Sequence, residues 1–420
     1  MTRKEEIATK LSEDSCVIRT KAVYEYHMNA VEEDPTNRSV YGVVRRCAFS
    51  AIESFHVTEA LPPDIMHDCL EGVFAMVLRI VLEALVDNNE VPLSLHDVNS
   101  ELSNFGYGQN DVRNKPPNIT RLMLRNGLSG KASEKWCLFR LLPMIIGNKV
   151  PVGDDDWKFY LICREMADYL MAPVYRKSWG AYLTNVIAEF IELFASYRDN
   201  IPCKVHYLIH YPRLMLMFGP LILLWCMRFE AKHQYFKKLA HVVCNFRNIA
   251  LTLAGRHQQR QCWEHCTKRG LGRVTANSSK QIGFQSLPAG LQQALREKWH
   301  ESNMYLSDRD ELWICDELEK NSVKYVVEDC FVAEFVQAQD IPLFVQIKYL
   351  ISFRKTWFLC GCIVLPGKFE EHMHAYRVKK PNDWLILLPG EEKDHHALDI
   401  YHNADTDVDY IPMRYKLTEY

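Results

Sequence analysis

The most regular pattern of apolar positions in the chain lies between residues 66 and 87. Its apolar residues recur at intervals of three and four, which places them on one face of a helix. They are Leu70, Val73, Phe74, Val77, Leu78, Val81, Leu82 and Leu85. Pro62 and Pro63 precede the pattern, and proline fits poorly inside a helix and favours extended chain before it. The pattern predicts a long helix with Asp64 as its N-cap and its end near residues 87–89.

Residues 119–200 predict almost continuous helix, because apolar and aromatic residues again recur at helical spacing. One pattern contains Trp136, Phe139, Leu142 and Ile146, and a second contains Trp179, Leu183, Val186, Ile187, Phe190, Ile191 and Phe194. Aromatic stripes of this kind are typical of faces through which helices pack on one another. We interpret them as core and not as a ligand site.

Short β-branched and aromatic runs replace the helical pattern beyond residue 323. They lie at 325–327, 343–353, 357–365, 374–378, 384–388 and 410–415, separated by Gly, Pro, Asn and Asp. These runs predict a small all-β domain, a barrel or a sandwich, over residues 323–420. The polar, Gly/Ser-containing region 261–322 before it is typical of a linker. One earlier run, residues 55–58, predicts a strand leading into Pro62, so that Asp64 would follow the carboxyl end of a strand.

Composition limits the classes of protein that the chain resembles. Its 420 residues allow two or three domains, and 48% hydrophobic and 25% charged residues are typical of globular proteins. The net charge of -3 gives no global sign of nucleic-acid binding, so any DNA contact must be a local patch. The 14 cysteines are scattered, and the charged N-terminus does not resemble a secretory signal. We therefore expect reduced thiols in a nuclear or intracellular protein that is not secreted, and no membrane span.

Polar groups able to bind metal gather at the start of the predicted helix over residues 66–87. Asp64, His67, Asp68 and Glu71 lie within two turns of one another. The acids alone also suit a well-capped helix, because carboxylates stabilise the positive end of the helix dipole. The dipole does not explain His67, because it favours negative charge at this end.

A second polar stripe is predicted on a helix that starts after Gly219 and Pro220. Its residues are Glu230, His233, Lys237 and His241, opposite an apolar face of Phe229, Phe236, Ala240 and Val243. An acid, two imidazoles and a lysine suit a metal and phosphate site, and they equally suit a solvated helix face.

Two other groups have partial metal-ligand character. His206 and His210 are four residues apart, a spacing that binds metal on a helix, but the sequence shows no third ligand. Cys262 and Cys266, with His257 and His265, fit no closed tetrahedral pattern well.

Two long motifs in this chain resemble a known family. They are LPPDIMHDCLEG at residues 61–72 and HYLIHYPRLMLMFGPLILLWCMRFEAKHQYFKKLAHVVCNFRNIALTLAGRHQ at residues 206–258. Both resemble the transposases of CACTA (En/Spm-like) DNA transposons and their relatives in animal genomes. The resemblance covers roughly residues 19–258, with a fainter similarity at HMHAYRV, residues 372–378.

The resemblance implies a ribonuclease-H-like core in which two aspartates and a glutamate hold two divalent metal ions. Asp64 matches the second aspartate, in a D-x-M-H setting, and Glu230 matches the glutamate, in an R-F-E setting. Both are therefore the expected catalytic and metal-binding residues. His67, Glu71, Arg228 and His233 are the expected second-shell or phosphate-orienting residues.

The expected fold is α/β and mainly helical, an incomplete ribonuclease-H-like core with a large helical insertion and a C-terminal all-β domain. Residues 1–63 would be a remnant of the N-terminal part, 64–260 the core with its insertion at about 119–200, 261–322 the linker and 323–420 the β domain. The family's first aspartate lies upstream of the matching region, and neither Asp14 nor Asp34 has a strand-like setting. We therefore expect weak binding of one Mg²⁺ or Mn²⁺ ion at most, and no catalysis.

The DNA of transposon ends is the partner that the resemblance implies, and a homo-oligomer is compatible with it. The basic residues chosen for DNA backbone contact are Lys232, Lys237, Lys238, Arg247 and Arg256, with a solvated helix face as the alternative. Two alternatives to an active transposase stay open. One is a host-recruited relic that binds DNA or a protein without catalysis. The other is an HD-type phosphohydrolase built on His67 and Asp68, which lacks a convincing upstream His and downstream Asp.

Overall fold

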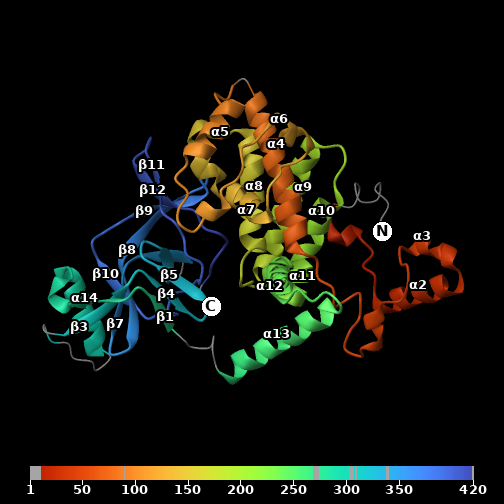
Figure 1. Cartoon of the computed structure of the whole chain (residues 1–420). Helices are drawn as coiled ribbons and strands as arrows, with labels where there is room; N and C mark the ends of the chain where they lie inside the picture. Colours follow the sequence, from red (N-terminus) through yellow and green to blue (C-terminus); the bar gives the residue numbers. More distant parts are fainter. Residues whose placement is uncertain are drawn as a thin grey trace. The chain divides into compact units, whose positions relative to one another are not determined.

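The sequence has two patterns of apolar positions, helical spacing and short strand-like runs. They fall largely into two different units of the chain. The computed structural model describes residues 11–88, 90–267, 274–301, 307, 310–336 and 340–418. Contacts divide these residues into unit 1, up to Asn104 together with Pro116–Cys226, and unit 2, Phe105–Lys115 together with the chain from Met227 onward. Figure 1 follows the chain from the helices of unit 1 to the strands of unit 2.

Unit 1 is formed by helices that bury the apolar stripes predicted from their spacing. Helices α4, α7, α8 and α9 pack on one another and provide most of its core (Figure 1). Phe74 stacks on Phe139 with ring centroids 4.4 Å apart, and the Tyr160 hydroxyl donates to the Phe139 carbonyl at 2.6 Å. Both predicted aromatic stripes contribute buried core residues, as expected. The helical segments of this unit are η1 (Glu13–Ser15), α2 (Lys21–Glu33), η2 (Pro35–Asn37), α3 (Arg38–Tyr41), η3 (Ala48–Ala51), η4 (Met66–Val73), α4 (Phe74–Asp87), α5 (Leu95–Asn104), α6 (Arg121–Asn126), α7 (Ala132–Ile146), η6 (Gly147–Lys149), α8 (Asp155–Leu170), α9 (Trp179–Tyr197), α10 (Cys203–Tyr207), η7 (Leu208–His210), α11 (Tyr211–Phe218) and η8 (Leu221–Leu223).

The strand predicted at residues 55–58 is wrong. The amides of Glu59 and Ala60 both donate to the His56 carbonyl, and the Thr58 amide donates to the His56 ring at 3.3 Å. The residues therefore form a turn in place of a strand, because local side-chain hydrogen bonds compete with strand pairing. Among the described residues before 274, none belongs to a strand.

Unit 2 contains the β-structure, and all of its named strand pairs are antiparallel. One sheet has the order β1-β4-β5, and the larger has the order β11-β12-β9-β8-β7-β3-β2, with β10 on β8 and β6 on β7. The long hairpin β7–β8 is its centre. The strands are β1 (Val274–Asn277), β2 (Lys280–Gly283), β3 (Glu311–Cys315), β4 (Glu317–Lys320), β5 (Val323–Val326), β6 (Cys330–Val336), β7 (Ile341–Phe353), β8 (Thr356–Glu370), β9 (Ala375–Lys379), β10 (Trp384–Leu387), β11 (Tyr401–Asn403) and β12 (Val408–Ile411).

Much of the region predicted as a linker, 261–322, is instead part of this β-structure. Residues 268–273, 302–306, 308 and 309 lie outside the described residues, and strands and a helix form between and after them. Helix α14 (Ala289–Glu301) and the short η9 (Phe284–Ser286) cover the sheet. Phe284, Leu291 and Trp299 are fully buried in a cluster with Phe353 and Phe358 of the central hairpin. The prediction failed because composition does not show that isolated apolar residues of the region provide core contacts.

A short segment from the helical part of the sequence, Phe105–Lys115, belongs to unit 2. It contains the single turn η5 (Val112–Asn114). Gln109 and Asn110 donate to the buried Asp329 carboxylate at 2.6 and 2.8 Å, and Phe105 stacks on Tyr401 with centroids 5.2 Å apart. These contacts fasten the segment to the β-structure.

Helices α12 (Met227–Val243) and α13 (Ile249–Cys266) form the remaining part of unit 2. Neither contains a buried residue. Phe229, Val242 and Leu251 are 68%, 79% and 69% exposed. The apolar face predicted on α12 is therefore not a core face among the described residues.

The structure establishes a mixed fold with a helical unit and an antiparallel β-structure near the C-terminus. The finer expectation of an incomplete ribonuclease-H-like core stays a prediction. No single helix among the described residues is long and apolar enough to cross a membrane. Two consecutive helical segments with a bend between them, Cys203–Phe218 and Leu221–Val243, are long and apolar enough only when they are counted together.

Candidate metal centre at the start of helix α4

The predicted helix starts as expected, but its first turns are wider than an α-helix. The Asp64 carbonyl accepts from the Asp68 amide at 3.0 Å, and its carboxylate accepts from the Met66 amide at 3.4 Å, as expected of an N-cap. Residues Met66–Val73 form a π-helix before α4 continues to Asp87. Such π-turns are rare and often occur at functional sites.

Lys204 supports this wide turn from helix α10. Its ammonium donates to the His67 carbonyl at 2.6 Å. A Cβ at Gly72 would lie 2.5 Å from Lys204 Cδ, so glycine leaves the space that the lysine occupies. Lys204 thereby holds the backbone that carries His67.

Cys226, at the end of unit 1, completes a cluster that the sequence did not predict. Its amide donates to Asp64 Oδ1 at 2.9 Å, and its thiol donates to Asp64 Oδ2 at 2.8 Å. The sulfur lies 3.4 Å from His67 Nδ1, and His67 is itself hydrogen-bonded to Asp64. The carboxylate, the imidazole and the thiol therefore all lie within 4.8 Å of one another. The available signal was a cysteine directly before the MRFEAKH motif.

The surroundings of Asp64 favour its charged form. Burial alone would raise the pKa of this carboxyl group, but hydrogen bonds from the Cys226 thiol and amide, the His67 ring and the Met66 amide outweigh it. Together they lower the pKa of Asp64 to about 2. A carboxylate that is already charged at neutral pH needs no deprotonation before it binds a cation.

Asp68 and Glu71 lie at the edge of this cluster. The Tyr211 hydroxyl donates to Asp68 Oδ2 at 3.2 Å, and burial raises the pKa of Asp68. Glu71 Oε2 lies 3.9 Å from His67 Nε2, so the pair is an ion pair only when His67 is protonated. Neither carboxylate adds a second acid to the three-residue cluster.

The donor set does not fit the two-magnesium site that the family resemblance implies. Magnesium prefers oxygen ligands, whereas the cluster offers one carboxylate, one imidazole and one thiol. Nitrogen and sulfur donors suit a single softer ion such as Zn²⁺, and imidazole also suits Mn²⁺ better than Mg²⁺. Asp64, His67 and Cys226 therefore fit one divalent ion.

Glu230, the other expected catalytic residue, lies in unit 2 on helix α12. Arg228, Lys232 and His233 flank it, and all four are exposed. Asp64 and Glu230 belong to different units, and a cleft that they share stays a prediction. The expected DNA-contact residues are exposed too: Lys232, Lys237, Lys238, Arg247 and Arg256.

Only one other group of three ligand atoms occurs among the described residues, and it contains His206 and His210. Cys262 and Cys266, whose spacing fits no closed tetrahedral pattern, do not form a third group there. Both of these cysteines are exposed on α13.

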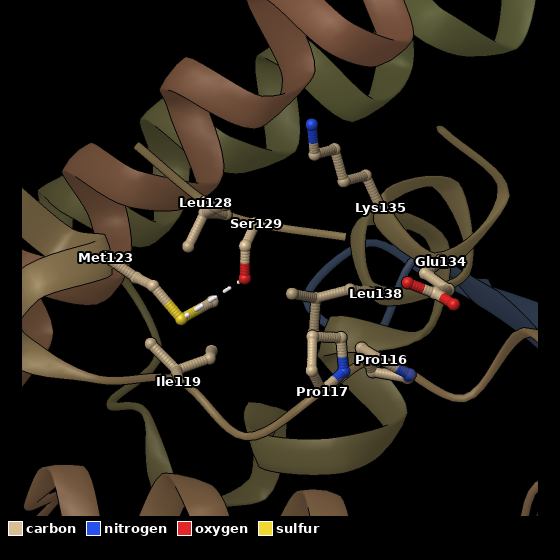
Figure 2. Close-up of a pocket in the computed structure, with 9 residues that line it drawn as sticks. All are labelled: Pro116, Pro117, Ile119, Met123, Leu128, Ser129, Glu134, Lys135 and Leu138. Atoms are coloured by element: carbon tan, nitrogen blue, oxygen red, sulfur yellow. Dashed lines mark hydrogen bonds between the residues drawn. The ribbon is translucent and has the colours of Figure 1, made fainter. Parts of the chain in front are cut away.

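A small pocket in unit 1 offers no alternative site. Figure 2 shows it between α6, α7 and the loop that joins them, with Pro116, Pro117 and Leu138 on its wall. It has room for about one water molecule. Its polar lining is engaged locally, since the Glu134 carboxylate accepts from the Lys131 amide at 2.9 Å. It is too small for a substrate.

No known protein-family model, curated protein or solved structure matches this chain.

Proposed function

We propose that this chain is a transposase-like protein of the CACTA type that binds one divalent metal ion at Asp64, His67 and Cys226 and binds DNA. The observation that carries the proposal is the convergence of these three side chains. Two of them belong to the D-x-M-H motif on which the resemblance rests, and the third stands directly before MRFEAKH. On this proposal unit 1 and α12 are parts of an incomplete ribonuclease-H-like core of a nuclear protein.

The proposal does not include DNA strand transfer. In-line displacement at a phosphodiester uses two metal ions about 3.5–4 Å apart, held mainly by shared carboxylates. The cluster at Asp64 has one carboxylate, and the neighbouring carboxylate of Asp68 accepts a hydrogen bond from the Tyr211 hydroxyl. These ligands suit one ion that accepts nitrogen and sulfur donors.

Calorimetric titration with Zn²⁺, Mn²⁺ and Mg²⁺ tests the metal site. We expect one Zn²⁺ or Mn²⁺ ion to bind this cluster more tightly than Mg²⁺, and Asp64→Asn and Cys226→Ser each to weaken its binding at least about tenfold. Asp68→Asn is the matched control, because it removes a neighbouring carboxylate outside the cluster, and it should leave affinity unchanged. Affinity that Asp64→Asn does not alter would exclude the site.

A plasmid-nicking assay with the same variants tests the absence of catalysis. We expect no nicking by the native chain above the level of Asp64→Asn with any of the three ions. Nicking that both Asp64→Asn and Glu230→Gln abolish would contradict the proposal and establish an active nuclease.

Helices α12 and α13 favour a second candidate function, DNA binding without catalysis. They contain no buried residue, and five exposed cations lie on them and on the turn between them. If all five contacted phosphates, the slope of log affinity against log salt would be about -4.5. No detectable affinity at low salt, or affinity that salt does not change, would exclude this candidate.

A further inference from the structure

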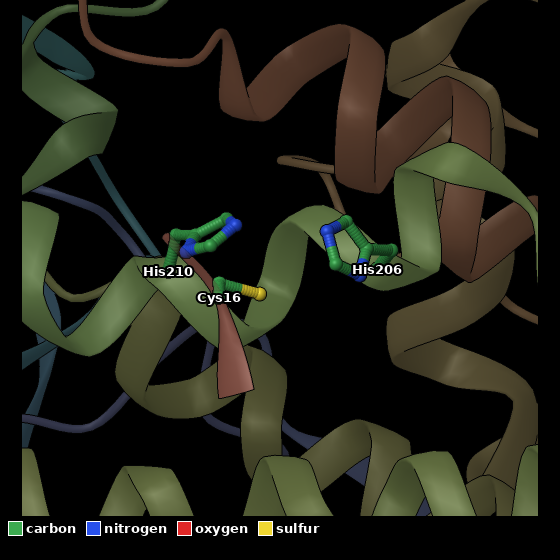
Figure 3. A group of neighbouring side chains, drawn as sticks. All are labelled: Cys16, His206 and His210. Atoms are coloured by element: carbon green, nitrogen blue, oxygen red, sulfur yellow. The ribbon is translucent and has the colours of Figure 1, made fainter. Parts of the chain in front are cut away.

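We propose that Cys16, His206 and His210 form a zinc site that fastens the N-terminal segment to the short helices α10 and η7. His206 lies in α10 and His210 ends η7, so their rings share one side of the same helical stretch. Their ring centroids are 5.4 Å apart, and the two ring planes are nearly perpendicular. Figure 3 shows the Cys16 thiol between them. This group supplies the third ligand that the sequence lacked.

The distances suit a single bound ion. The sulfur and the two ring nitrogens all lie within 4.8 Å of one another. Atoms so placed share a point no more than about 2.8 Å from each, against zinc–ligand bonds of about 2.0–2.3 Å. Movements of no more than about 0.5–0.8 Å would bring all three into bonding distance.

The surroundings of His210 orient it as a metal ligand. Its Nδ1 lies 2.8 Å from Glu13 Oε1, and Arg213 Nε donates to the same oxygen at 2.7 Å. A carboxylate on one ring nitrogen fixes the tautomer and leaves the other nitrogen to bind metal, the usual arrangement around histidine ligands of zinc. Glu13 and Cys16 belong to the same segment, so a single turn supplies both a ligand and its support.

The ligand types select the metal class. Two imidazoles and a thiol favour Zn²⁺ over Mg²⁺ or Ca²⁺, which prefer oxygen. His206 is only 6% exposed, whereas the His210 and Glu13 side chains are 20% and 24% exposed. Solvent can therefore reach the fourth position, where water completes a tetrahedron. Binding releases the thiol proton of Cys16.

Zinc at this site would have a structural effect, because it joins residues far apart in the sequence. Linking Cys16 to His206 closes a long loop of chain, and clips of this kind restrict the unfolded state. The site shares no residue with the cluster at Asp64, so either can fail without the other.

Zinc competition titration of the full chain, with Co²⁺ as a spectroscopic probe, tests the proposal. Cys16→Ser and His210→Gln should each weaken one zinc site by at least about tenfold and remove its thiolate–cobalt absorption, and Glu13→Gln should weaken it by about 10–100-fold. Cys203→Ser, which changes an exposed cysteine on the same helix, is the control and should have no effect. Equal zinc affinity in the native chain and Cys16→Ser would overturn the site.

The Cys226→Ser variant separates this site from the metal centre at Asp64. We expect it to retain the cobalt signal that Cys16→Ser removes. If Cys226→Ser removes all of the thiolate–cobalt signal, only the cluster at Asp64 binds metal and the present proposal is wrong.

Hydrogen exchange tests the structural role. Zinc should slow amide exchange at residues 12–19 in the native chain, whereas the same addition should not slow it in Cys16→Ser. Zinc binding that leaves exchange in this segment unchanged would contradict the role as a clip.

Discussion

Helix α4 follows one of the two motifs that stand out in the sequence, and helix α12 lies within the other. The two helices differ in how the protein surrounds them. Helix α4 buries eight of its residues, and the turns before it hold Asp64, His67 and Cys226 in one cluster. Helix α12 carries Glu230 and buries none. A side chain is positioned by the packing of the element that carries it. A distinctive motif alone therefore does not build a site.

The largest expected difference between the two regions concerns one matched pair of substitutions. Phe139→Ala removes a fully buried ring that stacks on Phe74, and it should lower the free energy of unfolding of unit 1 by about 3–5 kcal/mol. Phe229→Ala removes a ring that is 68% exposed, and its effect should stay within about 0.5 kcal/mol. Chemical denaturation measures both.

Similar losses of unfolding free energy for the two substitutions would contradict this difference between the regions. Such a result would mean that a surface outside the described contacts covers Phe229 in solution.

The next prediction concerns the 105–115 segment, a part of unit 2 that contacts the β-structure closely. A Cβ at Gly108 would lie 2.0 Å from Cγ of Asp399, so Gly108→Ala should force the 105–115 segment to shift and cost about 1–3 kcal/mol. Gly106→Ala is the matched control, because nothing lies within 4 Å of its Cβ. Thermal unfolding of both variants measures the difference. Equal stability of the two variants would show that the segment is not held against the β-structure.

The third prediction uses the acidic cluster beneath the same segment. Burial, followed by the charge of Asp111, raises the pKa of Asp399 to about 6, above the value of about 3.9 in an unfolded chain. The folded state therefore binds more protons, and the stability from this group is full below pH 4 and lost as pH rises through 6. The free energy of unfolding of unit 2 should fall by about 1 kcal/mol between pH 5 and pH 7.

Denaturation at the two pH values, with two variants, tests the assignment to Asp399. Asp399→Asn should remove this pH-dependent contribution, and Asp316→Asn, at an exposed aspartate of the same unit, should keep it. An unchanged pH dependence in Asp399→Asn would assign it to another group.

The sequence predicted best where spacing alone decides the structure. The stripes of α7 and α9 and the long helix from residue 66 to Asp87 follow from hydrophobic period, because burial of a single face determines them. The strand prediction at residues 55–58 failed because this run has no neighbouring strand, and its backbone hydrogen bonds are made within its own turn. The region 261–322 misled because composition does not reveal that Phe284 and Trp299 fill a core.

The candidate sites were predicted only in part, because distant residues complete them. Asp64 and His67 follow from local spacing, but Cys226 joins them from the other end of unit 1. In the same way Cys16 reaches His206 and His210 from the N-terminal segment. A single sequence does not show which distant residues lie close together in the fold. Helical spacing does show which residues within one turn are neighbours.

The smallest expected effect concerns a single lysine on α12 and distinguishes a DNA-binding face from a merely solvated one. Lys237→Gln should change the free energy of unfolding by less than about 0.5 kcal/mol, because the residue is exposed. If Lys237 contacts a phosphate, the substitution should reduce the slope of log affinity against log salt by about 0.9, through one fewer released counterion. Lys158→Gln is the control, since it changes an exposed lysine on helix α8 of unit 1 and should leave the slope unchanged.

Titrations of labelled duplex DNA at several salt concentrations measure both slopes. Equal slopes for the native chain and both variants would mean that Lys237 makes no phosphate contact. A reduced slope for Lys237→Gln alone would give the exposed helix a function that its lack of packing permits, because cations on a helix without buried residues remain accessible to a partner.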